Sequence, residues 1–138
     1  MRLDLTKRGD YAVRAALALA RTPTGQRLSA RRIAEEQRIP VQILPRIMTD
    51  LTRAGLVVST PGRTGGYALA RTRSSISVLD IIEAVEGDAH RQRCVLRGGP
   101  CRVAGVCDAH AVFAGAQDAL LTALGAATLD GLAGERVA

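Results

Sequence analysis

Two short β-rich runs on either side of a glycine-rich turn constrain the fold most. The runs are residues 56–59 and 67–71, and the turn between them, residues 60–66, contains three glycines and one proline. Apolar and β-branched runs that flank such a turn are typical of a β-hairpin. We therefore expect a hairpin near the middle of the chain.

Two helices are predicted at the start of the chain. Residues 6–20 have an apolar stripe at helical spacing, and Thr6 is placed to cap that helix. Ser29 has the same position before a second helix over residues 31–38, which ends at residues 39–40. So short a link to the next helix suits the tight turn of a helix-turn-helix motif.

A third helix is predicted between Pro40 and Gly55, since glycine commonly ends helices. Pro45 lacks a backbone donor, so we expect the regular helix to start nearer Leu44 than Val41. The expected buried side comprises Ile43, Leu44, Ile47, Met48 and Leu51, and the expected outward side comprises Gln42, Arg46, Thr49, Asp50 and Arg53. Three helices followed by a hairpin predict a winged helix-turn-helix, mainly α with a small β-hairpin wing.

Two further helices are predicted after the hairpin. One spans residues 77–87, with Ser77 as its cap, and a long one spans about residues 107–126. The apolar face of the long helix comprises Ala109, Phe113, Ala116, Leu120, Ala123 and Ala127. Such a face needs cover, either from its own domain or from the same helix of a second subunit, and we expect a homodimer. The predicted organisation is a DNA-binding domain (1–75), a linking helix and cysteine segment (76–106), and a dimerisation helix with its tail (107–138).

Charge is distributed unevenly along the chain. Residues 1–73 carry 14 basic and 5 acidic side chains, a net charge of +9, whereas residues 74–138 carry 5 basic and 8 acidic ones, a net charge of −3. A basic first half predicts a module that binds a polyanion. With 47% hydrophobic residues but only two tyrosines and one phenylalanine, the core is expected to be aliphatic and rich in alanine.

Other classes of protein fit the sequence poorly. No apolar run approaches the ~20 residues of a membrane span, and no hydrophobic signal core is present at the N-terminus, so we expect a cytoplasmic protein. Neither histidine stands in an arrangement that suggests hydrolysis, and the glycines of the turn lack the Lys-Ser/Thr of a phosphate loop. We expect no enzymatic activity.

All three cysteines fall within one glycine-rich segment that also leads to a histidine. Cys94, Cys101 and Cys107 are followed by His110 three residues on, which a helix starting at Cys107 would place on the same face. Three thiolates and one imidazole suit zinc and also iron–sulfur chemistry. An odd cysteine count argues against a disulfide framework, and a thiol-only redox switch is a further alternative.

Seven side chains are candidates for contact with double-stranded DNA. They fall at the start of the third helix, at the tip of the hairpin and at the start of the second helix. We expect Gln42 and Arg46 to reach base edges in the major groove, Arg63 and Thr64 to enter the neighbouring minor groove, and Ser29, Arg31 and Arg32 to meet phosphates.

Several motifs in the same order resemble the Rrf2 family of bacterial winged-helix regulators. They are residues 1–3, 6–15, 51–57, 62–71 and 77–87, the three cysteines, and residues 128–130. The resemblance implies a homodimeric transcription factor, a repressor by our expectation, that binds a palindromic operator. It also implies that an iron–sulfur cluster sensing redox state, nitric oxide or iron sets the DNA affinity.

The same resemblance implies Cys94, Cys101 and Cys107 as cluster ligands and offers two choices for the fourth. In one branch of the family a histidine at the position of His110 completes a two-iron cluster. In another branch an aspartate at the position of Asp10, from the partner subunit, completes a four-iron cluster. The six-residue gap after Cys94 is one longer than is usual in either branch. We favour His110, with a zinc-stabilised or thiol-redox regulator as the alternative.

Overall fold

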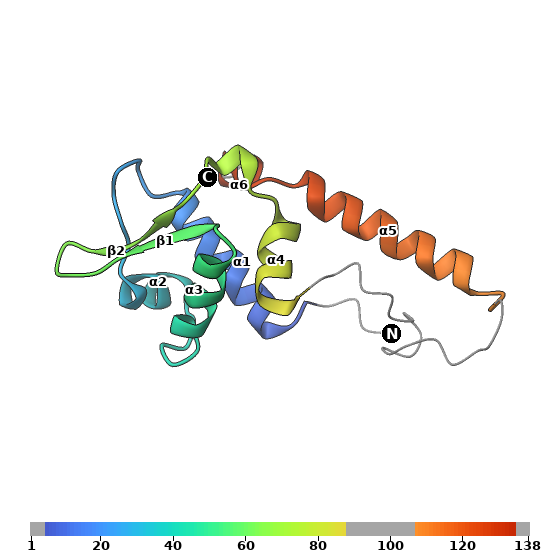
Figure 1. The fold of residues 1–138 in the computed structure, drawn as a ribbon, viewed down its shortest axis with the longest axis horizontal. Coiled ribbons are helices and arrows are strands. Elements are labelled where there is room, and N and C mark those ends of the chain that lie inside the picture. Colours follow the sequence, from blue (N-terminus) through green and yellow to red (C-terminus); the bar gives the residue numbers. More distant parts are fainter. Residues whose placement is uncertain (1–4, 88–106, 135–138) are drawn as a thin grey trace.

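The computed structural model describes residues 5–87 and 107–134. In chain order its elements are α1 (Lys7–Ala20), α2 (Ala30–Gln37), α3 (Leu44–Arg53), β1 (Val57–Thr60), β2 (Gly66–Leu69), the 3-10 turn η1 (Arg73–Ser75), α4 (Val78–Glu86), α5 (His110–Ala126) and α6 (Leu129–Gly134) (Figure 1). The predicted winged helix-turn-helix, mainly α with one hairpin, is confirmed.

Side-chain caps define where three helices begin. The Thr6 hydroxyl accepts from the Gly9 N–H at 3.1 Å, and the Ser29 hydroxyl accepts from the Arg32 N–H at 3.2 Å. Ser77 and Asp80 form a reciprocal capping box at the start of α4, with bonds of 2.9 and 3.0 Å. Each cap satisfies donors that the first turn of a helix leaves open. The caps predicted from the sequence are therefore confirmed.

Helix α3 begins at Leu44, as the proline predicted. Pro45 occupies its second position, where the missing N–H costs little. The helix ends before Gly55, whose φ of 76° is the left-handed conformation that glycine adopts most easily. The prediction that Ile43 is buried was wrong: it precedes the helix and is 42% exposed.

The wing is hydrogen-bonded to the segment that leads into α2. Strands β1 and β2 pair antiparallel from Val57 opposite Leu69 to Thr60 opposite Gly66. In addition, Leu28 N–H donates to the Tyr67 carbonyl at 3.0 Å and Tyr67 N–H donates to the Leu28 carbonyl at 2.7 Å. A Cβ on Gly66 would lie 2.6 Å from the Leu28 carbonyl oxygen, so this close approach requires glycine.

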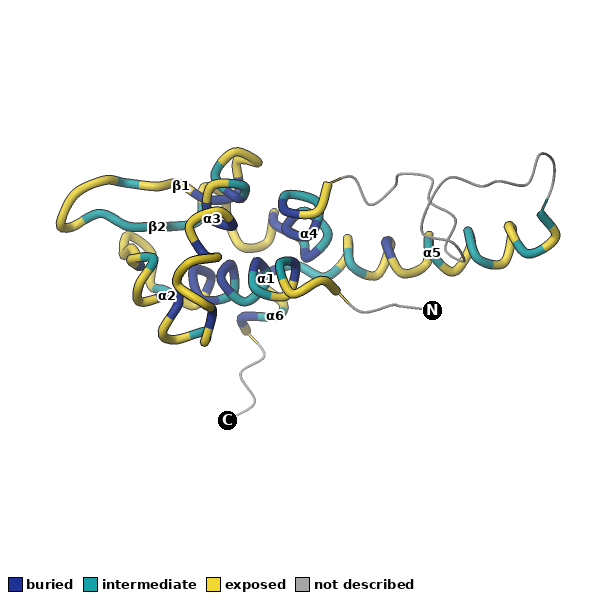
Figure 2. The backbone as a smooth tube through the Cα atoms, turned by 90° about the horizontal axis from the view of Figure 1, so that it is seen from below, coloured by how far each residue is buried: buried dark blue, intermediate teal, exposed yellow. Residues whose placement is uncertain are grey.

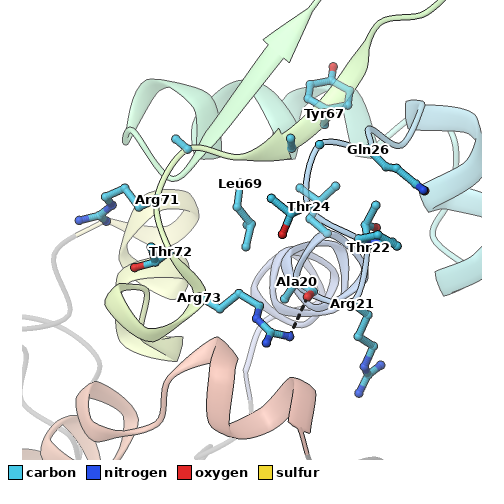
Figure 3. A pocket seen from close by; sticks show the side chains of 15 residues that line it. Ala20, Arg21, Thr22, Thr24, Gln26, Tyr67, Leu69, Arg71, Thr72 and Arg73 are labelled. Atoms are coloured by element: carbon cyan, nitrogen blue, oxygen red, sulfur yellow. Dashed lines mark hydrogen bonds between the residues drawn. The ribbon is translucent and has the colours of Figure 1, made fainter.

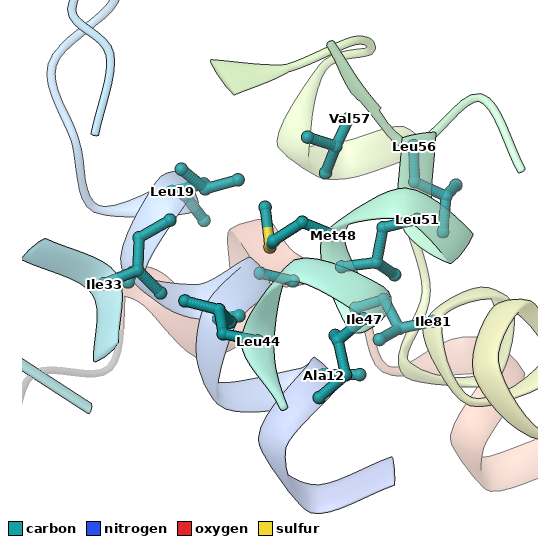
Figure 4. Packing of buried hydrophobic residues seen from close by; sticks show 14 of the residues in the cluster. Ala12, Leu19, Ile33, Leu44, Ile47, Met48, Leu51, Leu56, Val57 and Ile81 are labelled. Carbon is teal, nitrogen blue, oxygen red and sulfur yellow. The ribbon is translucent and has the colours of Figure 1, made fainter. Parts of the chain in front are cut away.

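The buried core is aliphatic, with α1 running through it (Figure 4). Alanines on α1 allow α3 to pack closely, and among the described residues no polar or charged side chain is buried. Helices α4 and α6 contribute to the same core through Ile81, Leu129 and Ala133. The fully buried large side chains are Ile33, Leu44, Ile47, Met48, Leu51, Val57, Ile76, Ile81 and Leu129.

Helix α5 extends away from this core (Figures 1 and 2). Leu121 is its one buried residue, whereas Val112 and Leu120 are 72% and 44% exposed. Its C-terminal end is fixed to α4 because Val78 N–H donates to the Ala127 carbonyl at 2.8 Å. Within residues 5–87 and 107–134, no helix has the length and apolar character that crossing a membrane requires.

Candidate functional site

Of the two side chains predicted to reach base edges, Arg46 lies on the first turn of α3 and Gln42 lies two residues before this helix. Gln42 and Arg46 are exposed, whereas Leu44, Ile47 and Leu51 on the opposite side are buried. Buried side chains of this kind fix the rotation of a helix about its axis, and this rotation turns Gln42 and Arg46 outward. Helices α2 and α3 and the hairpin lie at one end of the molecule, away from α5 (Figure 1).

Asp50 does not face outward as predicted, because it pairs with α1. Its carboxylate accepts from the Arg8 guanidinium, and its side chain is only 16% exposed. Arg53, one turn on, lies 3.9 Å from the other carboxylate oxygen of Asp50. The two arginines therefore offset the negative charge of this carboxylate. Arg8 and Asp50 are 42 positions apart, and no local pattern reveals such a pair.

The start of α2 presents Ser29, Arg31 and Arg32 at the surface. Ser29 uses its hydroxyl as the helix cap, and both arginines are exposed. Each arginine has a partner one turn on: Arg31 pairs with Glu35 at 2.9 Å and Arg32 with Glu36 at 2.7 Å. Exposed pairs of this kind contribute about 0.3–0.5 kcal/mol, so a phosphate can displace either carboxylate.

The tip of the wing carries Arg63 and Thr64, both exposed as predicted. Glycines close the turn around them. A Cβ on Gly65 would overlap the Thr60 carbonyl, and Gly62 has a φ of 99°. The tight turn therefore leaves the two side chains at the far end of the hairpin. We call the seven exposed side chains that the sequence predicts to contact DNA the reading face: Ser29, Arg31, Arg32, Gln42, Arg46, Arg63 and Thr64.

Arg14 joins α1 to the helix-turn-helix motif, a role that the sequence did not reveal. Its guanidinium donates to the Gln37 carbonyl at 2.6 Å and to the Asp10 carboxylate at 2.6 Å, and it lies 5.0 Å from the centre of the Tyr11 ring. Gln37 ends α2 immediately before the turn, where Arg38 has a left-handed φ of 54°. Arg14 thus satisfies a carbonyl that the helix end leaves open.

Of the predicted cluster ligands, Cys94 and Cys101 lie outside the described residues. Cys107 is half-buried, and His110 is exposed as the first residue of α5. The helix begins three residues later than predicted, so Cys107 is not part of it. The His110 N–H nevertheless donates to the Cys107 carbonyl at 2.9 Å, which places both residues in one turn. Among the described residues no three metal-binding side chains come together.

Asp10, the alternative fourth ligand, lies on the first turns of α1. Its side chain is exposed but already paired with Arg14 at 2.6 Å. To bind a metal, Asp10 would have to leave or share this pair. The structure therefore gives Asp10 a role within α1 that needs no metal.

The structure has a groove of about 760 Å³ (Figure 3). It is lined by the end of α1, the loop after it, strand β2 and the segment that follows β2. Arg73 lines it, donates to the Ala20 carbonyl at 3.1 Å and pairs with Asp130 of α6 at 3.1 Å. These bonds fasten η1 to α1 and α6, and no predicted site residue lines the groove.

Comparison with protein families and curated proteins gives a consistent result. A family model, Rrf2, described as an iron-dependent transcriptional regulator, matches residues 5–135. The HTH-type transcriptional regulator IscR of Escherichia coli K12 / DH10B is 35% identical over 127 residues, which cover 92% of this chain and 78% of that protein. The regulator of the same name from E. coli O157:H7 matches to the same extent.

Solved structures of regulators also resemble this chain. CymR, the global cysteine regulator of B. subtilis, superposes with a TM-score of 0.81 at 26% identity, covering 96% of this chain and 98% of CymR. T. potens IscR gives a TM-score of 0.77 at 28% identity, with 94% and 85% covered. The oxidised form of Staphylococcus aureus CymR gives 0.75 at 26% identity, with 99% of both chains covered.

Proposed function

This chain belongs to the Rrf2 family of transcriptional regulators, and on that premise we propose that it is a homodimeric repressor whose operator affinity depends on an iron–sulfur cluster. Its relatives are regulators of transcription and not enzymes. The observation that carries the proposal is the arrangement of the described residues: the exposed basic side chains of α2, α3 and the wing lie at one end of the molecule, and the exposed helix α5 extends from the other (Figure 1).

The reading face would bind one half of a palindromic operator. Gln42 and Arg46 would contact base edges in the major groove, since arginine is well suited to guanine and glutamine to adenine. Arg63 and Thr64 at the wing would enter the adjacent minor groove. Ser29, Arg31 and Arg32 would hold phosphates at the positive end of α2. Exposure of all seven side chains supports this assignment.

Helix α5 would form the dimer contact. It has 17 residues but buries only Leu121, and it leaves Val112 and Leu120 in water. Apolar faces of this kind mark contact surfaces, and a two-fold pairing of α5 would cover both copies at once. The same pairing would set two reading faces at a fixed spacing, which a palindromic site requires.

Cys94, Cys101, Cys107 and His110 would hold the cluster. The donor set fits, because thiolates and imidazole are established ligands of iron–sulfur centres. Cys107 and His110 are accessible within one turn, which supports His110 over Asp10, whose carboxylate is engaged by Arg14. His110 implies a two-iron cluster and Asp10 a four-iron cluster. When bound, the cluster would supply iron and sulfide that oxidants, nitric oxide or iron shortage can alter.

A regulator without a cluster is the second candidate. The same four ligands suit zinc, and three thiols can form a redox switch. The likeness to CymR supports this candidate, since a solved form of that regulator is described as oxidised and another as a cysteine regulator. In such a cluster-free regulator, Cys107 would respond to thiol oxidation or hold zinc, and the same reading-face residues would contact DNA.

The chain offers a route from the cysteine segment to the reading face. Glu86, the last residue of α4 and eight positions before Cys94, accepts a hydrogen bond from Thr6, the cap of α1. Helix α1 in turn holds α3 through Arg8 and Asp50, and the end of α2 through Arg14. Anchoring Cys107 would also restrain the first turn of α5, so releasing it would change the spacing between the two halves of a dimer.

Metal analysis of protein purified without oxygen tests the cluster. We expect iron, acid-labile sulfide and a visible absorption spectrum that decays on exposure to oxygen or nitric oxide. His110→Ala should alter the spectrum and lower the iron content, whereas the matched variant Asp10→Asn should leave both unchanged. A colourless protein with stoichiometric zinc after cluster reconstitution would exclude the cluster and favour the zinc-stabilised regulator.

A binding titration with and without the metal tests regulation. Duplexes selected from a randomised pool serve as probes, and binding is measured by fluorescence anisotropy. We expect affinity to change at least tenfold when the metal is removed, and to fall as salt rises, because phosphates dominate the binding energy. Equal affinity of both forms would contradict regulation by the cluster.

A further inference from the structure

Large apolar side chains are exposed beside the two base-reading residues. Val41 is 57% exposed and Ile43 is 42% exposed, and both flank Gln42 at the entrance to α3. Among the described residues, six large hydrophobic side chains are exposed, and Val41 and Ile43 are two of them. Scattered exposed apolar residues are ordinary, but two within three positions on the face that meets DNA need an explanation.

The backbone gives Val41 a definite direction. Residues 40–44 already form a helical turn, because the Leu44 N–H donates to the Pro40 carbonyl at 3.4 Å and Ile43 has right-handed helical angles. Val41 therefore precedes Pro45 by one turn, just as Gln42 precedes Arg46 by one turn. An apolar row, Val41 and Pro45, runs beside the polar row, Gln42 and Arg46, and all four side chains are exposed.

The core does not account for the exposure of Val41. Leu44, Ile47 and Leu51 fill the opposite side of the helix and are 1% exposed or less. The arginines predicted to contact DNA, Arg46 on α3 and Arg31 and Arg32 on α2, are exposed like Val41. A polyanion bound by these arginines could also present an apolar group to Val41. In the major groove of DNA that group is the 5-methyl of thymine.

We propose that Val41, supported by the Pro45 ring, contacts the 5-methyl group of a thymine next to the bases that Gln42 and Arg46 read. This inference rests on the proposed function, since it requires α3 to lie in the major groove. It adds a sequence requirement that hydrogen-bonding side chains alone do not impose: a thymine at one fixed position of each half-site.

Replacing thymine by uracil tests the contact, since the exchange removes only the methyl group. The probe is the duplex that the full-length protein selects from a randomised pool, with each thymine of a half-site exchanged singly for deoxyuridine. At one position we expect wild-type affinity to fall about threefold to fivefold, as loss of one buried methyl predicts. Val41→Ala should lower affinity for the thymine duplex and should lose nothing further on the exchange.

Val58→Ala is the matched control. It removes the same two methyl groups from a side chain that is 45% exposed, on strand β1 of the wing instead of at the entrance to α3. The thymine methyl lies in the major groove, so this variant should retain the full loss on exchange to uracil. Melting temperatures of both variants check that the fold is intact.

The possible outcomes separate this inference from the function beneath it. Specific binding without any position where uracil weakens wild type overturns the methyl contact and leaves the proposed function standing. An equal uracil loss in wild type and Val41→Ala also overturns it. Failure to bind any duplex overturns the proposed function, and this inference with it.

Discussion

The winged-helix half and helix α5 are built from similar residues but are used differently. Both are rich in alanine and leucine, yet the helices of the first half bury a continuous core, whereas 17 residues of α5 bury one. Apolar surface in the first half stabilises the fold of a single chain. Apolar surface on α5 is left exposed in the single chain, and we propose that a second copy covers it. Equal hydrophobicity therefore does not imply an equal role, and substitutions should separate the two.

The largest difference is expected in the stability of one chain. Leu51→Ala removes a fully buried side chain and should lower the free energy of unfolding by about 2–5 kcal/mol. Val112→Ala, at a side chain that is 72% exposed, should change it by less than about 0.5 kcal/mol in dilute protein. Urea denaturation followed by circular dichroism measures both values. Similar losses would show that α5 belongs to the core.

A charge on α5 should act on association and not on folding. Leu120→Glu would bury an unpaired carboxylate at the proposed dimer contact and should weaken dimerisation at least about 30-fold, or about 2 kcal/mol. Thr122→Glu is the control, because it lies on the other side of the same helix and is exposed. Sedimentation velocity over a range of concentrations measures the effect. A dimer unaffected by Leu120→Glu would place the contact elsewhere.

Within the first half, the reading face should separate into base and phosphate contacts. Arg46→Ala should lower affinity for the selected duplex by about 1–3 kcal/mol and reduce discrimination against a scrambled duplex. Arg31→Ala should weaken binding to both duplexes equally, as loss of a phosphate contact does. Anisotropy titrations at constant salt measure both. Equal losses on the two duplexes for Arg46→Ala would remove Arg46 from base recognition.

The smallest effect is expected from the acidic partners on α2. Glu35→Gln releases Arg31 from its ion pair and removes a negative charge near the proposed phosphate contact. DNA affinity should rise by about 0.3–0.5 kcal/mol at low salt, the value of an exposed pair, and the gain should vanish at high salt. Glu83→Gln on α4, in the body of the molecule, is the comparison variant. Weaker binding by Glu35→Gln would mean that the pair orients Arg31 for DNA.

Local chemistry explains why much of the fold could be predicted. The caps at Thr6, Ser29 and Ser77 and the effect of Pro45 on α3 depend on neighbours within four residues, and all are confirmed. The hairpin could be predicted because its glycine-rich turn is also a local feature of the sequence. Periodicity also predicted the buried side of α3, except at Ile43, which precedes the regular helix.

Features that depend on distant parts of the chain could not be predicted. The pair of Arg8 with Asp50 and the bond from Arg14 to Gln37 join helices that the sequence does not place together. The short helix α6 returns to the core through Leu129 and Ala133, although its glycines give no helical signal. For the candidate cluster site, all four ligand assignments stay predictions, and Cys94 and Cys101 fall outside the described residues.

The two hydrogen bonds between Leu28 and Tyr67 have a consequence for the energetics of operator binding. They hold the wing beside α2 before any duplex arrives, so the entropy lost in ordering the hairpin belongs to folding and not to association. A preorganised wing should give a smaller entropic penalty on binding than a hairpin that orders on contact. Calorimetry of Gly66→Ala, which crowds the Leu28 carbonyl, should show this as a less favourable entropy of binding.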